Sequence, residues 1–162
     1  MCVVIDMNTL SRVFDQENKE HSEFKPVLDW IEEGKGRIVY GGSKYLLELE
    51  KMTHYRRLLI NYGKRRRTIK LDDYKVDQKE KEIKEKNQHP DFNDTHIVAI
   101  IIVSRCRLLC SKDSSSYPFI QDKKLYPSKF GKISIYKGYA DNELLLSWKI
   151  NELCKRCREE NR

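Results

Sequence analysis

The sequence predicts an α/β protein with a mostly parallel central sheet, and three observations lead to this. Short apolar runs of the kind that form buried strands occupy residues 2–5, 37–40, 108–111 and 133–136. Segments with the apolar spacing of helices lie between these runs. The chain has 162 residues, which suffice for one well-buried domain and hardly for two. Strands that alternate with helices are typical of a sheet covered by helices.

Local signals place the helices. Gly34 ends one apolar helical pattern, and Ser43 is a suitable N-cap for the next. Residues 76–87 are almost all charged or amide side chains with opposite charges four positions apart, which indicates an exposed helix without site chemistry. The expected helical segments, besides the central one described next, are 24–33, 44–52, 53–61, 76–87, a turn within 114–122, and a final helix that starts at Asn142.

The central stretch from Asp91 to Ser114 contains the longest apolar run, residues 97–103. Its residues are mostly β-branched, which suits a strand. A helix is favoured because Asn93 is a good N-cap, Asp94 suits the positive first turn, and the roughly 12 residues to Arg105 are an ordinary helix length. The strand is the alternative interpretation. The apolar run is too short to cross a bilayer in either case.

The charge balance favours a polyanionic partner. The chain has 32 Lys and Arg against 25 Asp and Glu, a net charge of +7, and nucleic acid is the leading candidate. Tyr62 precedes a basic run formed by Lys64, Arg65, Arg66 and Arg67. Basic side chains neutralise phosphates and aromatic rings stack on bases, so these residues are candidates for binding RNA or single-stranded DNA. A solvated loop without a ligand is the alternative.

The beginning of the chain gives no sign of a secretory signal. Residues 2–5 are apolar, but Asp6 ends the run after four residues. No apolar run is long enough to span a membrane. We therefore expect a cytoplasmic protein that does not enter a membrane.

Acidic residues occur at four places that one edge of a parallel sheet would bring together. Asp6 follows the first strand, Asp113 follows the strand at 108–111, and Asp94 begins the central helix. Ligand sites collect at the carboxyl ends of parallel strands. Each of these residues taken alone reads as a helix cap or a surface charge, but a cluster of carboxylates is costly unless cations neutralise it. Oxygen ligands without His or Cys select Mg²⁺ or Mn²⁺.

The fourth acidic position lies on the helix expected after the second strand. Glu48 and Glu50 both occur there, and residues two positions apart do not share a helix face, so only one of them can point into a site. Glu48 is closer to the apolar side of this helix. The other interpretation is that Glu48 and Glu50 are both solvated surface charges.

Four short motifs occur in an order that resembles the PIN domain nucleases, many of which are toxin ribonucleases of toxin–antitoxin pairs. The motifs are VVIDMN at 3–8, SKYLLELEK at 43–51, NDTHIVA at 93–99 and LLCSKDSS at 108–115. Together they span nearly the whole chain. The resemblance implies a PIN-like three-layer α/β/α fold as a single domain over 1–162. Its charged helical segment at about 64–89 is an insertion that is longer than in a minimal toxin.

The resemblance also implies chemistry, namely metal-dependent hydrolysis of RNA. Matched residue by residue, the acidic quartet is Asp6, Glu48, Asp94 and Asp113, of which Asp6, Asp94 and Asp113 would bind Mg²⁺ or Mn²⁺. Asn8, Ser111 and Ser114 would support these ligands by hydrogen bonds. His96 is a poor candidate for the base, because two positions beyond Asp94 it points elsewhere on the helix.

The resemblance further suggests partners, which are RNA, an inhibitor or antitoxin protein, and a second copy in a homodimer. Two alternatives stay open. One is a non-catalytic PIN-like module that binds nucleic acid or protein, with the acids as caps and surface charges. The other is a nuclease for single-stranded or flap DNA, because the residues that recognise a 2′-hydroxyl cannot be read from sequence.

Overall fold

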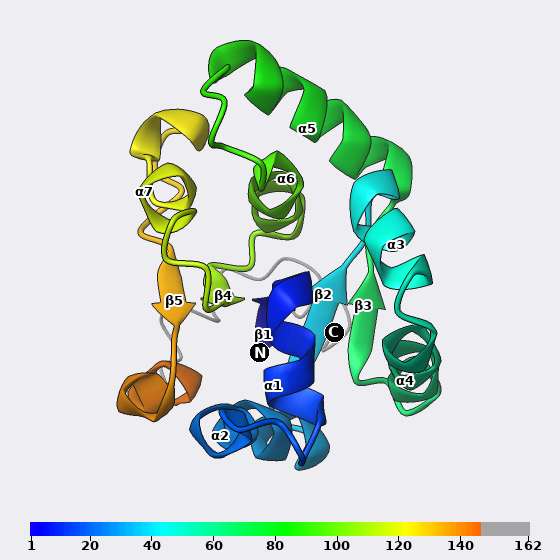
Figure 1. The fold of residues 1–162 in the computed structure, drawn as a ribbon. Coiled ribbons are helices and arrows are strands. Elements are labelled where there is room, and N and C mark those ends of the chain that lie inside the picture. Colours follow the sequence, from blue (N-terminus) through cyan, green and yellow to red (C-terminus); the bar gives the residue numbers. More distant parts are fainter. Residues whose placement is uncertain (147–162) are drawn as a thin grey trace.

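The protein is built on a five-stranded sheet in which every neighbouring pair of strands is parallel (Figure 1). The computed structural model describes residues 1–146. The spatial order of the strands is β3-β2-β1-β4-β5. Their bounds are β1 Cys2–Ile5, β2 Arg37–Tyr40, β3 Thr68–Lys70, β4 Leu108–Cys110 and β5 Ser134–Tyr136. The prediction of an α/β protein with a mostly parallel sheet is confirmed.

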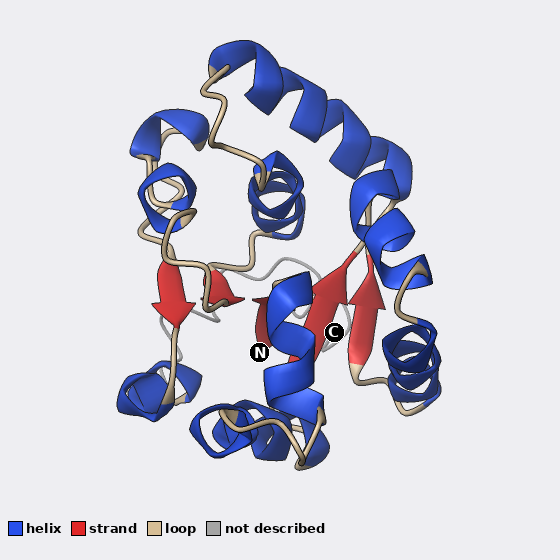
Figure 2. Ribbon diagram, viewed as in Figure 1, coloured by secondary structure: helices blue, strands red, loops and turns tan. Residues whose placement is uncertain are grey.

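Helices cover both faces of this sheet and give three layers (Figure 2). One face is covered by α3 Ser43–Glu50, α5 Asp73–Lys86, α6 Thr95–Ser104 and α7 Tyr117–Ile120. The other face is covered by α1 Leu10–Phe14, α2 His21–Glu32, α4 Thr53–Lys64 and the 3-10 helix η3 Tyr139–Leu145. Two short 3-10 helices, η1 Met7–Thr9 and η2 Lys123–Leu125, lie in connections.

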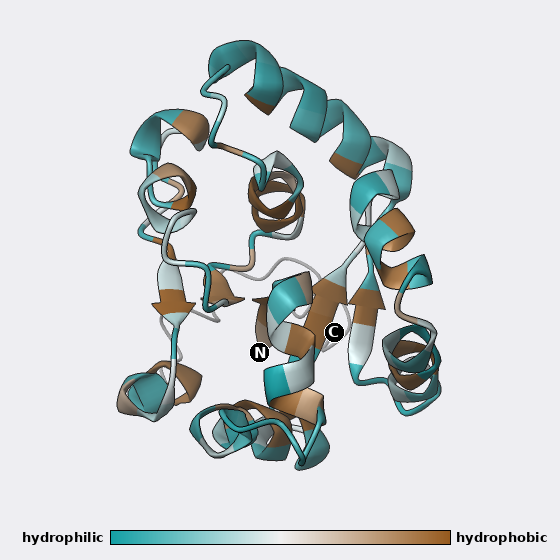
Figure 3. Ribbon diagram, viewed as in Figure 1, coloured by the Kyte–Doolittle hydropathy of each residue, from teal (hydrophilic) through white to brown (hydrophobic). Residues whose placement is uncertain are grey.

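The core lies between the sheet and the inner faces of the helices. All four residues of β1 are fully buried, as expected for a central parallel strand with both faces covered. Apolar residues are concentrated on the strands and on α6, whereas α5 is polar over most of its surface (Figure 3). The sequence pattern therefore reflects depth in the molecule, because the most apolar segments occupy its middle.

Helix α6 settles the choice between helix and strand for the central stretch. It is helical, and its residues from Thr95 to Ile101 are buried because α5 packs on it. The β-branched residues are tolerated because tertiary packing outweighs a weak local preference. Asp94, and not Asn93, occupies the N-cap position.

Helix α5 is closer to the acidic residues than its sequence suggested. Val76, Glu80 and Ile83 are buried against the rest of the fold, and the carboxylate of Glu80 accepts a hydrogen bond of 2.8 Å from the hydroxyl of Thr95. The prediction of an exposed helix without site chemistry is corrected in this respect, because Glu80 holds the start of α6.

Three further differences from the predicted elements concern strands and helix ends. The edge strand β3 was not expected. Ser43 is the first residue of α3 and Gly42 is its N-cap, because the Ser43 hydroxyl donates to Asp77 at 2.5 Å. The final segment forms the 3-10 helix η3, and the rest of the helix predicted from Asn142 falls outside the described residues.

No helix within residues 1–146 is long and apolar enough to cross a membrane.

Successive strands are added to the sheet first on one side of β1 and then on the other. From β1 the chain moves outward through β2 to β3, and it then returns to add β4 and β5 on the other side of β1. Connections leave the neighbouring strands β1 and β4 toward opposite sides (Figure 1). In open α/β sheets, ligands bind at such a point, outside the carboxyl ends of the strands, and this place is called the crevice below. Asp6 follows β1 and Ser111 follows β4, which places both residues at this crevice.

Candidate metal-binding site

Asp6 lies at the end of β1 and is only 6% exposed. Its backbone N–H donates to the carbonyl oxygen of Cys110 at 3.0 Å, which extends the pairing of β1 with β4 by one residue. Its carboxylate oxygen Oδ2 accepts a hydrogen bond of 2.9 Å from the hydroxyl of Ser111. Burial raises the pKa of Asp6, and the nearby carboxylates of Asp113 and Glu48 raise it further.

Ser111 connects Asp6 to the loop that carries Asp113. Its hydroxyl oxygen accepts a hydrogen bond of 3.2 Å from the backbone N–H of Asp113. Its carbonyl oxygen accepts one of 2.8 Å from the Tyr117 hydroxyl. The Asp113 carboxylate in turn accepts hydrogen bonds from the N–H and the hydroxyl of Ser115, at 3.1 and 2.5 Å. The loop after β4 is therefore fixed in place beside Asp6.

Asp94 reaches the same crevice from the N-terminus of α6. Its side chain is half-buried and does not cap its own helix. Burial raises its pKa to about 6, and the charges of Asp6 and Asp113 raise it as well. Ser116 is buried and hydrogen-bonds to Asp94, which lowers the pKa, while its hydroxyl is also 2.9 Å from the carbonyl oxygen of Asp113. Ser116 therefore joins the two acidic segments.

Glu48 is the acid of α3 that belongs to this group. It is half-buried, and burial raises its pKa, with Lys44 opposing and Asp94 adding to the rise. Glu50 is exposed and lines a separate cavity of about 250 Å³ together with Tyr40 and Arg56. The structure thus places Glu48, and not Glu50, beside the other acids.

The four carboxylates affect one another and are not neutralised by basic side chains. Within residues 1–146, no lysine or arginine forms an ion pair with Asp6, Asp94 or Asp113. Lys44 is the nearby cation that opposes the raised pKa of Asp94, but its Nζ donates to the carbonyl oxygen of Asn93. Raised pKa values at the carboxyl edge of a sheet are typical of a site that receives a cation.

The donor chemistry of this site suits a hard divalent ion, because the group offers only carboxylate and hydroxyl oxygens. In the described part of the chain, no three His, Cys, Asp or Glu side chains are close enough together to hold an ion directly. Mg²⁺ is commonly bound through one or two carboxylates while it keeps several waters. The buried carboxylate of Asp6 and the half-buried carboxylate of Asp94, neither of which forms an ion pair with a basic side chain of the described residues, fit such a hydrated ion.

His96 is buried next to Glu48. It is 3% exposed, and its Nε2 atom is 3.7 Å from Oε2 of Glu48. Burial lowers its pKa to about 4, and Lys44 lowers it as well, so the ring is neutral near pH 7. Neither ring nitrogen has a hydrogen-bond partner among the described residues.

Of the residues proposed to support the ligands, Ser111 touches Asp6, whereas Asn8 and Ser114 are exposed. Asn8 acts through its backbone, because its main-chain hydrogen bond lowers the pKa of Asp6. The carbonyl oxygen of Ser114 accepts a hydrogen bond of 3.4 Å from the Tyr117 N–H. Sequence reasoning missed Lys44 and Ser116, although Lys44 lies one helical turn before Glu48.

The basic run at 64–67 is not brought to the acidic edge. It immediately precedes β3, so it lies at the amino end of the parallel strands. Tyr62 is 7% exposed, packs on Phe14 with ring centroids 5.6 Å apart, and donates its hydroxyl to Glu32. Arg65 is paired with Glu32 at 2.5 Å. The expected stacking of bases on Tyr62 is corrected, because its ring has no free face.

Comparison of the chain with known protein families, with curated proteins and with solved structures found no match.

Proposed function

We propose that the protein is a metal-dependent phosphodiesterase. More specifically, we propose a PIN-like endoribonuclease that uses Mg²⁺ or Mn²⁺. The observation that carries this proposal is that Asp6, Glu48, Asp94 and Asp113 lie near one another at the crevice between β1 and β4, where burial and neighbouring acids raise the pKa of Asp6, Glu48 and Asp94. These residues come from four separate parts of the chain. A partly buried group of like charges is unfavourable for folding alone, which supports a functional reason for it.

We assign each of the four acids a role in the proposed reaction from how deeply its side chain is buried. Asp6 and Asp94 would hold the ion, because Asp6 is buried, Asp94 is half-buried, and neither forms an ion pair with a basic side chain within residues 1–146. Asp113 would orient a water that the ion binds. Glu48, at the more exposed rim, would orient the attacking water. A bound Mg²⁺ or Mn²⁺ polarises the scissile phosphate and lowers the pKa of a bound water.

Basic and aromatic side chains near the acids suit a nucleic-acid strand. Lys112 and Lys137 are exposed after β4 and β5, at the same edge as Asp113. The ammonium of Lys137 lies over the ring of Tyr117, 6.0 Å from its centroid. The Tyr117 hydroxyl is anchored to Ser111, which holds the half-buried ring beside the crevice. Phosphates on the lysines and a base near this ring are the contacts expected for a single strand.

The proposal is tested by incubating the pure protein with a pool of single-stranded RNAs and Mn²⁺, with and without EDTA. Cuts that require the metal ion and disappear in Asp94→Asn are expected. Asp91→Asn is the matched control, because the Asp91 side chain is 83% exposed and lies three residues away. Cuts that survive both EDTA and Asp94→Asn would contradict the proposal. The preference for RNA rests on the resemblance alone, and a DNA oligonucleotide of the same sequence tests it.

A second candidate is a PIN-like module that binds nucleic acid without cleaving it. The observation in its favour is that no three acidic side chains within residues 1–146 lie at ligand distance from a common point. Under this alternative the pool of RNAs would be bound and left intact, and Asp94→Asn would leave binding unchanged.

A further inference from the structure

A cavity of about 380 Å³ lies at the edge of the sheet opposite to the acidic site. The loop that enters β5 forms it, and its walls include Lys123, Tyr126, Lys129, Phe130 and Lys132. A smaller space beside the cavity is lined by Arg105, and it shares Lys129 and Phe130 with the cavity. The volume is within the range of small-molecule sites, roughly 300–1,000 Å³.

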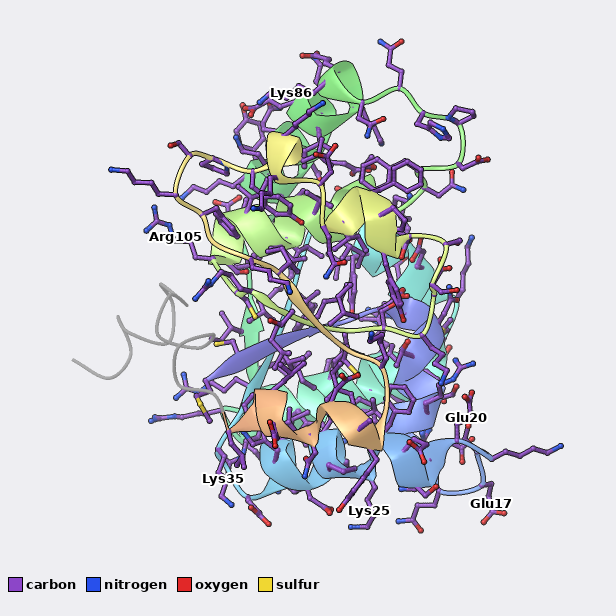
Figure 4. The ribbon with its side chains drawn as sticks, turned by 90° about the vertical axis from the view of Figure 1, so that its left-hand side faces the viewer. Glu17, Glu20, Lys25, Lys35, Lys86 and Arg105 are labelled. Carbon is purple, nitrogen blue, oxygen red and sulfur yellow. The ribbon has the colours of Figure 1, made fainter. Side chains whose placement is uncertain are left out.

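Four cations without ion pairs within residues 1–146 surround the cavity and the smaller space beside it, and the acid Asp122 lies near enough to Tyr126 to raise its pKa. Lys123, Lys129, Lys132 and Arg105 are exposed, and none of them forms an ion pair with the residues of the described part. In Figure 4, Arg105 projects from one side of the molecule, whereas Glu17 and Glu20 lie on the opposite side. Three lysines at the cavity and Arg105 at the adjoining space outweigh Asp122 and favour an anionic ligand.

Two aromatic rings form the apolar wall of the cavity. The centroids of Tyr126 and Phe130 are 5.1 Å apart, and both rings are half-buried. The Tyr126 hydroxyl donates to the carbonyl oxygen of Ile120 at 2.6 Å, which fixes the ring. A flat ring can therefore bind against a wall that is already in place, which lowers the entropic cost of binding.

The backbone at two of the cations is in the left-handed region. Arg105 has φ 59° and Lys129 has φ 64°, although this region favours glycine. Arg105 follows α6 in the position where glycine is most frequent after a helix. Long basic side chains at such positions carry a conformational cost, and residues of this kind cluster at ligand sites.

We propose that this cavity binds a nucleotide, with the base against Tyr126 and Phe130 and the phosphate near Arg105, Lys129 and Lys132. The nucleotide is either free or one unit of an RNA strand. The site does not depend on the proposed nuclease activity, because it lies at the other edge of the sheet and uses none of the acidic residues.

The test uses AMP as the probe, in EDTA, with affinity measured by calorimetry or by titration followed by NMR. The double variant Arg105→Gly with Lys129→Gly removes two cations where glycine suits the backbone, so its melting temperature should not fall. AMP affinity should fall on the order of tenfold, because two exposed charge contacts are lost. Arg66→Gly is the matched control, since Arg66 is also exposed, has φ 56°, and precedes β3 instead.

A second variant tests the aromatic wall, because Phe130→Leu keeps the apolar volume and removes the ring. It should weaken AMP and leave pyrophosphate unaffected. Unchanged AMP affinity in the double glycine variant, equal loss in Arg66→Gly, or pyrophosphate binding as tight as AMP would each overturn the proposal. An eight-nucleotide uridine strand identifies the source of the ligand: much tighter and more salt-dependent binding than AMP indicates RNA, and similar binding indicates a free nucleotide.

Discussion

The hydroxyl of Ser111 donates to Oδ2 of Asp6 at 2.9 Å and joins two residues that are 105 positions apart in the chain. The same hydroxyl oxygen accepts the N–H of Asp113 at 3.2 Å. One small side chain therefore sets the position of two of the four acids. This contact exists because β1 and β4 are neighbours in the sheet, at the point where the strand order reverses.

Replacing Ser111 with Ala should therefore affect both stability and activity. The buried carboxylate of Asp6 would lose its donor, and the free energy of unfolding should fall by about 1–3 kcal/mol. Metal affinity or cleavage should fall by about 10–100-fold, as is typical when a group that orients a ligand is removed. Urea unfolding and an RNA cleavage assay measure the two effects.

Ser114→Ala is the control for this variant, because Ser114 is exposed and lies three residues further on. Ser114→Ala should change neither the free energy of unfolding nor the rate of RNA cleavage. If both alanine variants behave alike, Ser111 does not position Asp6.

Glu48→Gln and Glu50→Gln form a pair that tests the choice between the two acids of α3. Glu48 is half-buried beside Asp94, whereas Glu50 is exposed elsewhere on the helix. We expect cleavage by Glu48→Gln to fall on the order of 100-fold, since a group that orients the reacting water is lost. Glu50→Gln should stay within about twofold of the unsubstituted protein. The reverse ranking in the cleavage assay would remove Glu48 from the site.

Asp94→Asn should stabilise the metal-free protein while it abolishes cleavage. The pKa of Asp94 is raised to about 6, because its charged form is buried near Asp6 and Asp113. An amide removes that charge, so the free energy of unfolding near pH 7 should rise on the order of 1 kcal/mol. Mn²⁺ should raise the melting temperature of the unsubstituted protein but not that of the variant. A less stable Asp94→Asn protein would contradict this expectation and show that the hydrogen bond with Ser116 outweighs the cost of burying the charge.

The same raised pKa predicts how stability depends on pH in EDTA. Asp94 binds a proton more tightly in the folded protein than its ordinary value of 3.8 implies, so its contribution favours folding at low pH. This contribution is lost as the pH rises through about 6. His96, whose pKa burial lowers to about 4, acts in the opposite direction over the same pH range, because the unfolded chain binds its proton more tightly. The contribution of Asp94 is therefore the difference between the urea midpoints of Asp94→Asn and of the unsubstituted protein, which should be larger near pH 7.5 than near pH 5.

Asp94→Asn removes the contribution of Asp94 and keeps that of His96, so the comparison isolates the carboxylate. A difference between the two proteins that is the same at both pH values, or larger near pH 5, would contradict the assignment of Asp94 as a destabilised carboxylate.

Most of the fold could be predicted from the sequence because its strands are buried. The runs that became β1, β2, β4 and β5 are apolar, and this signal is local. The edge strand β3 was missed because it has only three residues, of which Ile69 alone is buried. Its strand conformation comes from pairing with β2, which the local sequence does not encode.

Three of the acidic residues could be placed because Asp6 and Asp113 follow strands and Asp94 begins a helix, and the sheet brings such positions together. The contacts between them depend on tertiary structure. Ser116 meets Asp94 only because α7 and α6 lie on the same face of the sheet. Tyr62 looked free for base stacking, but Glu32, 30 positions earlier in the chain, accepts its hydroxyl. Such pairings are invisible to a sequence pattern.

The central claim is that Asp6 and Asp94 hold a divalent ion at the crevice between β1 and β4. Its most direct test is a crystal soaked in Mn²⁺ and measured with anomalous scattering. A peak between the carboxylates of Asp6 and Asp94, absent in crystals of Asp94→Asn, is the predicted result. Manganese bound only elsewhere, or a lysine or arginine side chain in the crevice in place of the ion, would contradict the claim.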